Sequence, residues 1–347
     1  MNLRHLVTRL VAPALLAGLV GCGSDTAYTV GGTVAGSVGP LVLQLNGNAV
    51  TTVAGPGGFT LAGELGNGSA YVVTLVSAAQ NCTVVNGSGT VSGANVSSVA
   101  VTCGAVVRSA NLSGANENPA VTTAASGRGS VVVNATTKAI AGGVSFSGLT
   151  PSTGGHHIHQ APAGNPTANG PVIIGLVLAP DGSSAVVPAG TVLSDTQYAA
   201  LLAGELYINL HTAANPGGEI RGQLTVRGGV TAAMATLTGV QEVPPNNSTA
   251  SGRGTLIFDT STLDIIAAYN THNVVGATVS HIHTGAPGTN GPANVVTFRA
   301  GTNLFVAPAG SRITAQQVID LNAGNLYFNV HSATFPGGEI RGQVAVQ

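Results

Sequence analysis

The 347-residue chain has no tryptophan, and only 7% of its residues are charged and 4% are aromatic. Charged residues usually make up about a quarter of a soluble protein, so Ser, Thr, Asn and Gly must cover most of this surface. The formal net charge of −1 excludes the basic surface that nucleic-acid-binding proteins use. A low net charge combined with 44% hydrophobic residues argues against a disordered chain.

Several motifs of catalytic sites are also missing. The sequence has no Cys-x-x-Cys pair, no phosphate-binding glycine loop and no Ser-His-Asp order. We therefore lean towards a protein without enzymatic activity, although the sequence alone leaves this open. Its many glycines, valines and threonines are typical of short strands joined by tight turns.

The apolar run at residues 10–20 is too short to span a membrane. It follows a basic start and ends in Leu-Val-Gly-Cys at Cys22, which resembles the lipobox of bacterial lipoproteins. The resemblance implies a signal peptide at residues 1–21, lipidation of Cys22 and a membrane tether at residues 22–26. Gly23 after the cysteine implies the outer membrane or cell surface. The alternative is an ordinary secretory signal that contains a cysteine by chance.

Two further cysteines, Cys82 and Cys103, remain in the chain. An even number of cysteines in an exported protein predicts a disulfide between them. The alternative is a pair of free, buried thiols.

Residues 27–104 contain about seven short alternating segments separated by Gly- and Asn-rich turns, which predicts a β-sandwich. The segment Tyr-Thr-Val-Gly-Gly-Thr-Val that begins at Tyr28 resembles the Ig-like repeats of bacterial surface proteins. We expect this unit to be a spacer that holds the rest of the chain away from the membrane.

The remaining sequence is one unit written twice, at residues 105–227 (repeat 1) and 230–347 (repeat 2). Both copies contain Ser-Gly-Arg-Gly and, later, Pro-Gly-Gly-Glu-Ile-Arg-Gly-Gln. Each copy also predicts one short helix, which begins after a Ser194 or Thr314 cap and ends at a glycine. Because the linker between the copies is short, we expect the two repeats to pack against each other.

These motifs resemble the CHRD domain, which is named after chordin and is common in bacterial exported proteins. The shared pattern is an Asn-Glu-x-Pro start (Gln-Glu-x-Pro in repeat 2), the Ser-Gly-Arg-Gly turn, a His-Ile-His segment and the Pro-Gly-Gly-Glu-Ile-Arg-Gly end. Together with the strand-and-turn pattern of the whole chain, this organisation predicts an all-β protein of three β-sandwich domains in series. The resemblance also favours an extracellular, protein-binding context. We expect the starting glutamates, Glu117 and Glu242, to brace a loop.

Eight of the nine histidines lie in the two repeats. Residues along a strand alternate between its two faces, so the polar residues around His-Ile-His and within Leu-Tyr-Ile-Asn-Leu-His should share one face, opposite the aliphatic residues. This pattern predicts an outer face that carries imidazoles, a carboxylate, a guanidinium and a tyrosine in each repeat. Its members are His157, His159, Tyr207, His211, Glu219 and Arg221 in repeat 1, and His281, His283, Tyr327, His331, Glu339 and Arg341 in repeat 2.

Three histidines on neighbouring strands are a good ligand set for a transition metal. His-x-His on a strand separates two Cα atoms by about 6.6 Å, which lets both rings reach one ion, and imidazole suits copper or zinc. The pattern also resembles copper–zinc superoxide dismutase. That resemblance implies copper-type ligands at His157, His159 and His211 and an anion-steering role for Arg221. The bridging histidine and the zinc-loop ligands of that family have no counterpart here. The alternative is a set of hydrogen-bonded histidines that hold loops, beside a plain Glu219–Arg221 ion pair.

Two functions follow from these features. The first is a lipid-anchored protein of the bacterial cell envelope with a non-enzymatic binding or structural role, in which the outer face of each repeat engages an envelope or extracellular protein or a glycan. The second is a metal-handling or redox protein that holds copper or zinc at the three histidines of each repeat. We expect no nucleic-acid partner and no cofactor other than such a metal.

Overall fold

The computed structural model describes residues 26–347 except 79, 81, 150–154 and 181. Cys22 and the expected signal peptide lie outside these described residues. The described residues form β-strands joined by turns, with two α-helices, one in each repeat. The predicted all-β fold with one short helix per repeat is confirmed. No helix in this part of the chain is long and apolar enough to cross a membrane.

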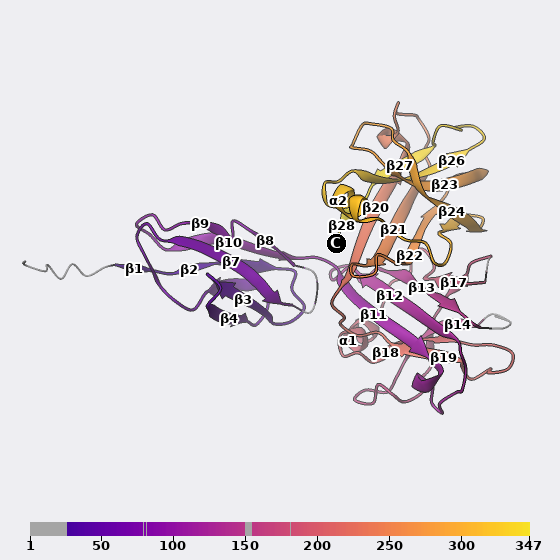
Figure 1. Ribbon diagram of the computed structural model, residues 1–347, viewed down its shortest axis with the longest axis horizontal. Coiled ribbons are helices and arrows are strands. Elements are labelled where there is room, and N and C mark those ends of the chain that lie inside the picture. Colours follow the sequence, from indigo (N-terminus) through magenta and orange to yellow (C-terminus); the bar gives the residue numbers. More distant parts are fainter. Residues whose placement is uncertain (1–25, 79, 81, 150–154, 181) are drawn as a thin grey trace, which may run out of the picture.

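The first unit is a sandwich that stands apart from the repeats in Figure 1. Its strands are β1 (Ala27–Tyr28), β2 (Val30–Ala35), β3 (Leu41–Leu45), β4 (Ala49–Val53), β5 (Gly57–Thr60), β6 (Leu65–Gly66), β7 (Ala70–Ser77), β8 (Cys82–Val85), β9 (Ser88–Thr90) and β10 (Val96–Cys103). Two four-stranded sheets, β5-β2-β10-β8 and β4-β3-β7-β9, enclose one apolar core. In β3 the alternate residues Leu41, Leu43 and Leu45 point into this core. Cys82 and Cys103 face each other across β8 and β10 and form a disulfide.

Repeat 1 folds into a nine-stranded, barrel-like sheet. Its elements are β11 (Val106–Ser113), β12 (Ser126–Val133), β13 (Ile140–Ser147), β14 (His156–Gln160), β15 (Val172–Gly175), β16 (Val177–Leu178), β17 (Ser184–Val186), α1 (Asp195–Leu202), β18 (Leu206–Leu210) and β19 (Ile220–Gln223). The strand order is β15-β14-β18-β19-β11-β12-β13-β17-β16. The aliphatic residues Ile158, Ile208 and Ile220 of the central strands are fully buried in the core.

Repeat 2 has the same architecture. Its elements are β20 (Val230–Thr238), β21 (Ser251–Asp259), β22 (Ile265–His272), β23 (Ala277–Thr284), β24 (Ala293–Gly301), β25 (Leu304–Val306), α2 (Ala315–Asn322), β26 (Leu326–Ser332), β27 (Ile340–Gln343) and β28 (Ala345–Val346). The strand order is β21-β22-β25-β24-β23-β26-β27-β20-β28, and a further pairing of β21 with β20 closes the barrel. Its core contains Phe258, Phe328 and Ile340.

Both helices begin at the caps that the sequence predicts. The Ser194 hydroxyl accepts a hydrogen bond from the Gln197 amide, and the Gln197 side chain accepts one from the Ser194 amide. Thr314 and Gln317 form the same reciprocal pair in repeat 2. Such a capping box satisfies two amides that the first helical turn would leave unbonded.

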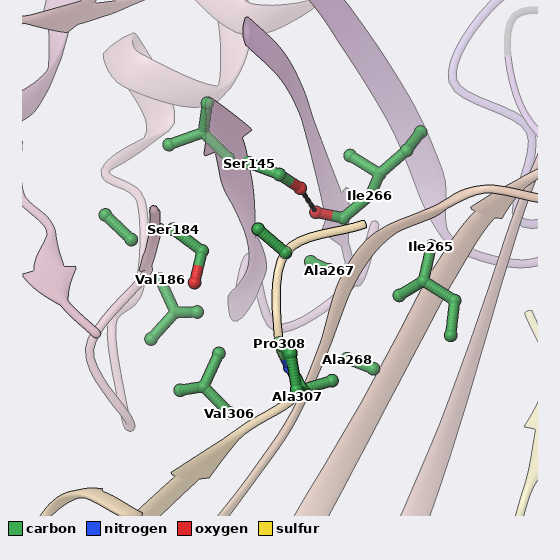
Figure 2. Close-up of a pocket in the computed structure, with 13 residues that line it drawn as sticks. Ser145, Ser184, Val186, Ile265, Ile266, Ala267, Ala268, Val306, Ala307 and Pro308 are labelled. Carbon is green, nitrogen blue, oxygen red and sulfur yellow. Dashed lines mark hydrogen bonds between the residues drawn. The ribbon is translucent and has the colours of Figure 1, made fainter. Parts of the chain in front are cut away.

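The two repeats pack back to back (Figure 1) through a nearly symmetric apolar contact. Four residues of repeat 1 pack against four residues of repeat 2, and the two sets occupy equivalent positions that are 125 residues apart in the sequence, such as Ala105 and Val230. These residues are Ala105, Val107, Val132 and Ala141, and Val230, Ala232, Ile257 and Ile266. The Ser145 hydroxyl donates to the Ile266 carbonyl at 2.7 Å, which Figure 2 shows at the seam between β13 and β22. The Gly142 amide donates to the Tyr269 hydroxyl.

Replacing Cys82 and Cys103 together by alanine is expected to lower the unfolding free energy of the first unit by about 3 kcal/mol. A bridge across 21 residues restricts the unfolded chain by roughly that amount. Hydrogen exchange of peptides from residues 41–77 measures the change. Peptides from the two repeats serve as the internal control and should exchange as in the unmodified chain. Unchanged protection within residues 41–77 would contradict the expectation.

Candidate metal centre

Neighbouring strands bring together the three histidines of repeat 1. β14 pairs with β18 so that His157 lies opposite Asn209 and His159 lies opposite Tyr207. His211 follows the last residue of β18. The ring centroid of His157 lies 5.6 Å from that of His159 and 5.1 Å from that of His211, and the His159–His211 separation is 5.8 Å. These residues are called triad 1.

Repeat 2 builds the same cluster from β23 and β26. The ring centroids of His281, His283 and His331 lie 5.4, 5.0 and 6.2 Å apart. These residues are called triad 2. In each triad, one nitrogen from each ring lies within 4.8 Å of the other two. All six metal candidates from the sequence therefore meet in two groups of three.

Backbone carbonyls fix the tautomer of two histidines in each triad. His159 Nδ1 lies 2.9 Å from the Gly170 carbonyl oxygen, and His211 Nδ1 lies 3.0 Å from that of Pro216. Because a carbonyl only accepts, both Nδ1 atoms carry the proton, and each Nε2 keeps its lone pair. His283 and His331 bond Gly291 and Pro336 at 2.9 and 3.1 Å in the same way. A second hydrogen bond of this kind is typical of metal-ligating histidines.

The nitrogens that remain in triad 1 have no hydrogen-bond partner among the described residues. They are Nδ1 of His157 and Nε2 of His159 and His211, and all three atoms are buried. Buried polar atoms are normally bonded, and a buried group without a partner calls for an explanation such as an ion or water. One nitrogen from each of the three rings also lies within 4.8 Å of the other two, and three imidazole donors at this spacing are the kind of ligand set that a metal ion requires.

The spacing of triad 2 fits two nitrogens on one ion. His281 Nδ1 lies 3.1 Å from His331 Nε2. Two ligands at about 2.0–2.1 Å from a tetrahedral ion lie about 3.3 Å apart. Without a metal, the proton on His281 Nδ1 can bridge the two rings, because His331 Nε2 accepts.

Burial keeps the triads in the neutral form that metals bind. Burial lowers the pKa of His159 and His211, and nearby imidazoles lower the pKa of His159 further. Burial, followed by the proximity of His331 and His283, lowers the pKa of His281 to about 4. These rings are therefore neutral at pH 7, and the Nε2 atoms of His159 and His211 carry no proton that a metal would have to displace.

Tyr207 and Arg221 stack on the outer side of triad 1. The Tyr207 ring lies parallel to that of His159, with centroids 5.0 Å apart, and the Arg221 Cζ lies 3.6 Å from the Tyr207 centroid on the strand beyond. In repeat 2 the corresponding distances for His283, Tyr327 and Arg341 are 4.8 and 3.5 Å.

The expectation that Tyr207, Arg221 and their counterparts offer an exposed binding surface is wrong, although most of the triad histidines on this face are only half-buried. Tyr207 and Arg221 are each 1% exposed, because the loop between β14 and β15 covers them. Arg221 donates to the carbonyl oxygens of Pro166 and Ala168 and to the side chain of Asn169 in that loop. Tyr327 and Arg341 are equally buried, and Arg341 bonds the Ala286 carbonyl.

The alternative of loop-holding histidines beside a Glu219–Arg221 ion pair is half right: His159 and His211 bond loop carbonyls, but the ion pair does not form. Glu219 and Glu339 are buried and accept hydrogen bonds from hydroxyl groups instead. Thr123 and Thr212 each donate to Glu219 at 2.6 Å, and Ser248 donates to Glu339 at 2.8 Å. Glu219 and Arg221 do lie two residues apart on one face. They do not form an ion pair, because each one has other hydrogen-bond partners.

A model of the CHRD domain matches residues 108–224 and residues 233–344, which together make up more than half of the chain. The chain belongs to the CHRD domain family. Each of its two CHRD domains carries one complete triad. No curated protein and no solved structure matches the chain.

Each CHRD domain also holds a buried carboxyl group beside the sheet. Glu117 is 7% exposed and lies against Asn209 and Gly218. A side chain at position 218 would collide with both groups, since its Cβ would come within 2.4–2.7 Å of them, and Gly218 also has a φ of +128°. Burial raises the pKa of Glu117 to about 7, a feature that the sequence motif did not reveal. Glu242 repeats this arrangement at Gly338, with its pKa raised to about 7.

Two histidines of the CHRD domains lie outside the triads. His156 packs edge-on against Phe146 at 5.3 Å, and His272 stacks on Phe305 at 5.2 Å. Both are buried in the aliphatic side of the sheet. They are therefore parts of the core.

Replacing Arg221 by methionine is expected to lower the unfolding free energy by about 2–3 kcal/mol. The substitution leaves the buried carbonyl groups of the loop, at Pro166 and Ala168, without their hydrogen-bond donor. The Gly170 amide, which donates to the Tyr207 hydroxyl, should also exchange faster with solvent. Chemical denaturation and hydrogen exchange measure the two effects. Arg227→Met is the matched control, because Arg227 is exposed. Equal stability of both variants would contradict the bracing role.

The double substitution Glu117→Gln with Glu242→Gln tests the buried carboxyl groups. A carboxyl group whose folded pKa is about 7 holds its proton between pH 4.5 and 7, where the unfolded chain has lost it. Its contribution to stability therefore falls as the pH rises through that window. The variant stays neutral, so its stability relative to the unmodified chain should increase from pH 5 to pH 8.

Denaturation of both proteins at pH 5 and pH 8 gives this difference directly. The histidines titrate alike in the two proteins, so their effect cancels. A stability difference that is the same at both pH values would show that these carboxyl groups are ionised throughout.

Proposed function

We propose that each CHRD domain binds one copper or zinc ion through its histidine triad, and that the protein is a non-enzymatic metal-binding protein of the bacterial cell envelope. Two observations on triad 1 carry this proposal: one nitrogen from each ring lies within 4.8 Å of the other two, and each ring has a buried nitrogen without a hydrogen-bond partner among the described residues. Triad 2 repeats the spacing and the carbonyl bonds.

Hydrogen bonds to backbone carbonyls determine which nitrogen two of the histidines in each triad would offer. His159 and His211 would bind through Nε2, since Nδ1 of each donates to a carbonyl. His157 would bind through Nδ1, as would His281 in triad 2. Imidazole nitrogens suit copper and zinc, and three protein ligands leave a fourth position for water or another small ligand.

The surroundings of the triads favour storage or transfer of a metal over catalysis. Arg221 directs its donors at loop carbonyls and at side chains, so it is not free to steer an anion towards an ion in triad 1. Glu219 is likewise held by two threonines. These contacts argue against a dismutase-like role, and the burial of Tyr207, Arg221 and their counterparts removes much of the surface first expected to engage a protein or glycan.

The cellular setting belongs to the same proposal. Lipidation of Cys22 and a short tether at residues 22–26 would anchor the chain to a membrane. The sandwich at residues 27–104, with its resemblance to Ig-like repeats, would act as a spacer. The CHRD domains at residues 105–227 and 230–347 would then stand clear of the lipid surface.

Calorimetric titration of the full chain with Cu(II) and Zn(II) tests the metal sites. We expect about two ions per chain, one for each triad, with a dissociation constant below about 1 μM. His159→Ala should leave one ion per chain, and His159→Ala combined with His283→Ala should leave none.

His272→Phe is the matched control, because it removes a buried imidazole outside the triads. It should retain both ions. Failure to bind either metal more tightly than roughly 100 μM in folded protein, or loss of binding in the His272 variant alone, would overturn the proposal.

A further inference from the structure

The nearly symmetric contact between the repeats has one closed side, where an arginine of repeat 1 meets two acids of repeat 2. The Ser-Gly-Arg-Gly motif was expected to form a turn but begins strand β12, and its Arg128 forms an ion pair with Asp259, at the end of β21. Arg128 also lies 3.8 Å from Asp264, which in turn pairs with Arg312 at 3.1 Å. Three charged groups from the second repeat thus gather around one arginine from the first.

The turn after β21 presents the Asp259 carboxylate to Arg128. One carboxylate oxygen, Oδ1, accepts hydrogen bonds from the Ser261 and Thr262 amides. The other oxygen, Oδ2, is thereby left to bind the arginine. The turn fixes the direction of the carboxylate, so the ion pair needs little further ordering.

On the opposite side of the contact the equivalent arginine is kept, but the residues that would surround it are different. Arg253 of β21 is the counterpart of Arg128, and Asn134 is the counterpart of Asp259, each 125 positions away. Asn134 makes the same turn, because its Oδ1 accepts from the Thr136 and Thr137 amides. However, its remaining atom is an amide nitrogen, which carries protons and cannot accept a bond from a guanidinium.

The other charged groups are also missing from this side. Ala139 stands at the position of Asp264, and Val192 stands at the position of Arg312, since the two pairs form equivalent bridges. Arg253 is exposed and makes no hydrogen bond or ion pair within the described residues. It keeps the position of its counterpart but has lost the carboxylate.

A cavity of about 600 Å³ opens at this place between the two repeats. Arg253 is the one charged side chain in its lining, and much of the rest is apolar, including Ile140, Pro188, Val192 and Met234. This volume lies within the usual range for small-molecule sites, about 300–1,000 Å³. It is too small for a folded partner.

We propose that this inter-repeat cleft binds a small organic carboxylate. The ligand carboxylate takes the place that Asp259 holds on the closed side and bonds the Arg253 guanidinium, as arginine commonly pairs with carboxylates. The apolar body of the ligand lies against Ile140, Val192 and Met234. This site is separate from the histidine triads and does not depend on a bound metal.

Titration of the full chain with benzoate, followed by calorimetry, tests the cleft, and benzamide serves as the uncharged ligand of the same shape. Benzoate should bind at least about tenfold more tightly than benzamide, the order of gain expected for a charge-assisted bond. Arg253→Gln should remove this preference. Arg227→Gln, at an exposed arginine outside the cleft, should retain it.

Asn134→Asp provides a second variant, which restores the missing carboxylate within the protein. Aspartate keeps the Oδ1 bonds of the turn, as Asp259 does, so the fold should persist. The new carboxylate should occupy Arg253 and weaken benzoate binding by about tenfold. Equal affinities for benzoate and benzamide in the unmodified chain, or benzoate binding that neither the Arg253 nor the Asn134 substitution changes, would overturn the proposal.

Discussion

The arrangement of each CHRD domain depends on one buried guanidinium. Removing a charge from water is costly unless hydrogen bonds replace the lost hydration. Arg221 meets that condition by donating to the loop between β14 and β15, and it rests on the Tyr207 ring. The loop is thereby held over the sheet, and its Gly170 carbonyl fixes the tautomer of His159. The position of the arginine thus determines which nitrogen a histidine two strands away can offer to a metal.

Much of this could be read from the sequence, and the reason is local. Strand alternation places His157 and His159 on one face whatever the rest of the chain does. The caps at Ser194 and Thr314 likewise depend only on neighbouring residues. The cover over that face could not be predicted, because it depends on where a loop distant from Arg221 in sequence comes to lie. The raised pKa of Glu117 escaped prediction for the same reason.

Features inside the two domains repeat more strictly than features of the contact between them. The triads, the stacked tyrosines and the buried arginines recur with nearly the same distances. The contact between the domains retains its apolar positions but not its charges, since Asp259 and Asn134 occupy equivalent turns. Within a domain, a change in one member would leave buried partners without bonds. At the contact, solvent can replace what is lost.

The fusion of both copies into one chain gives this contact a freedom that identical subunits lack. In a symmetric dimer of identical chains, a substitution appears on both sides of the axis at once. An aspartate introduced to hold one arginine would then have to hold the other as well. Here the two sides are encoded separately, so Asp259 closes one side while Asn134 leaves the other open. A duplicated chain can therefore keep the stability of a symmetric assembly and still give one of its two edges a use of its own.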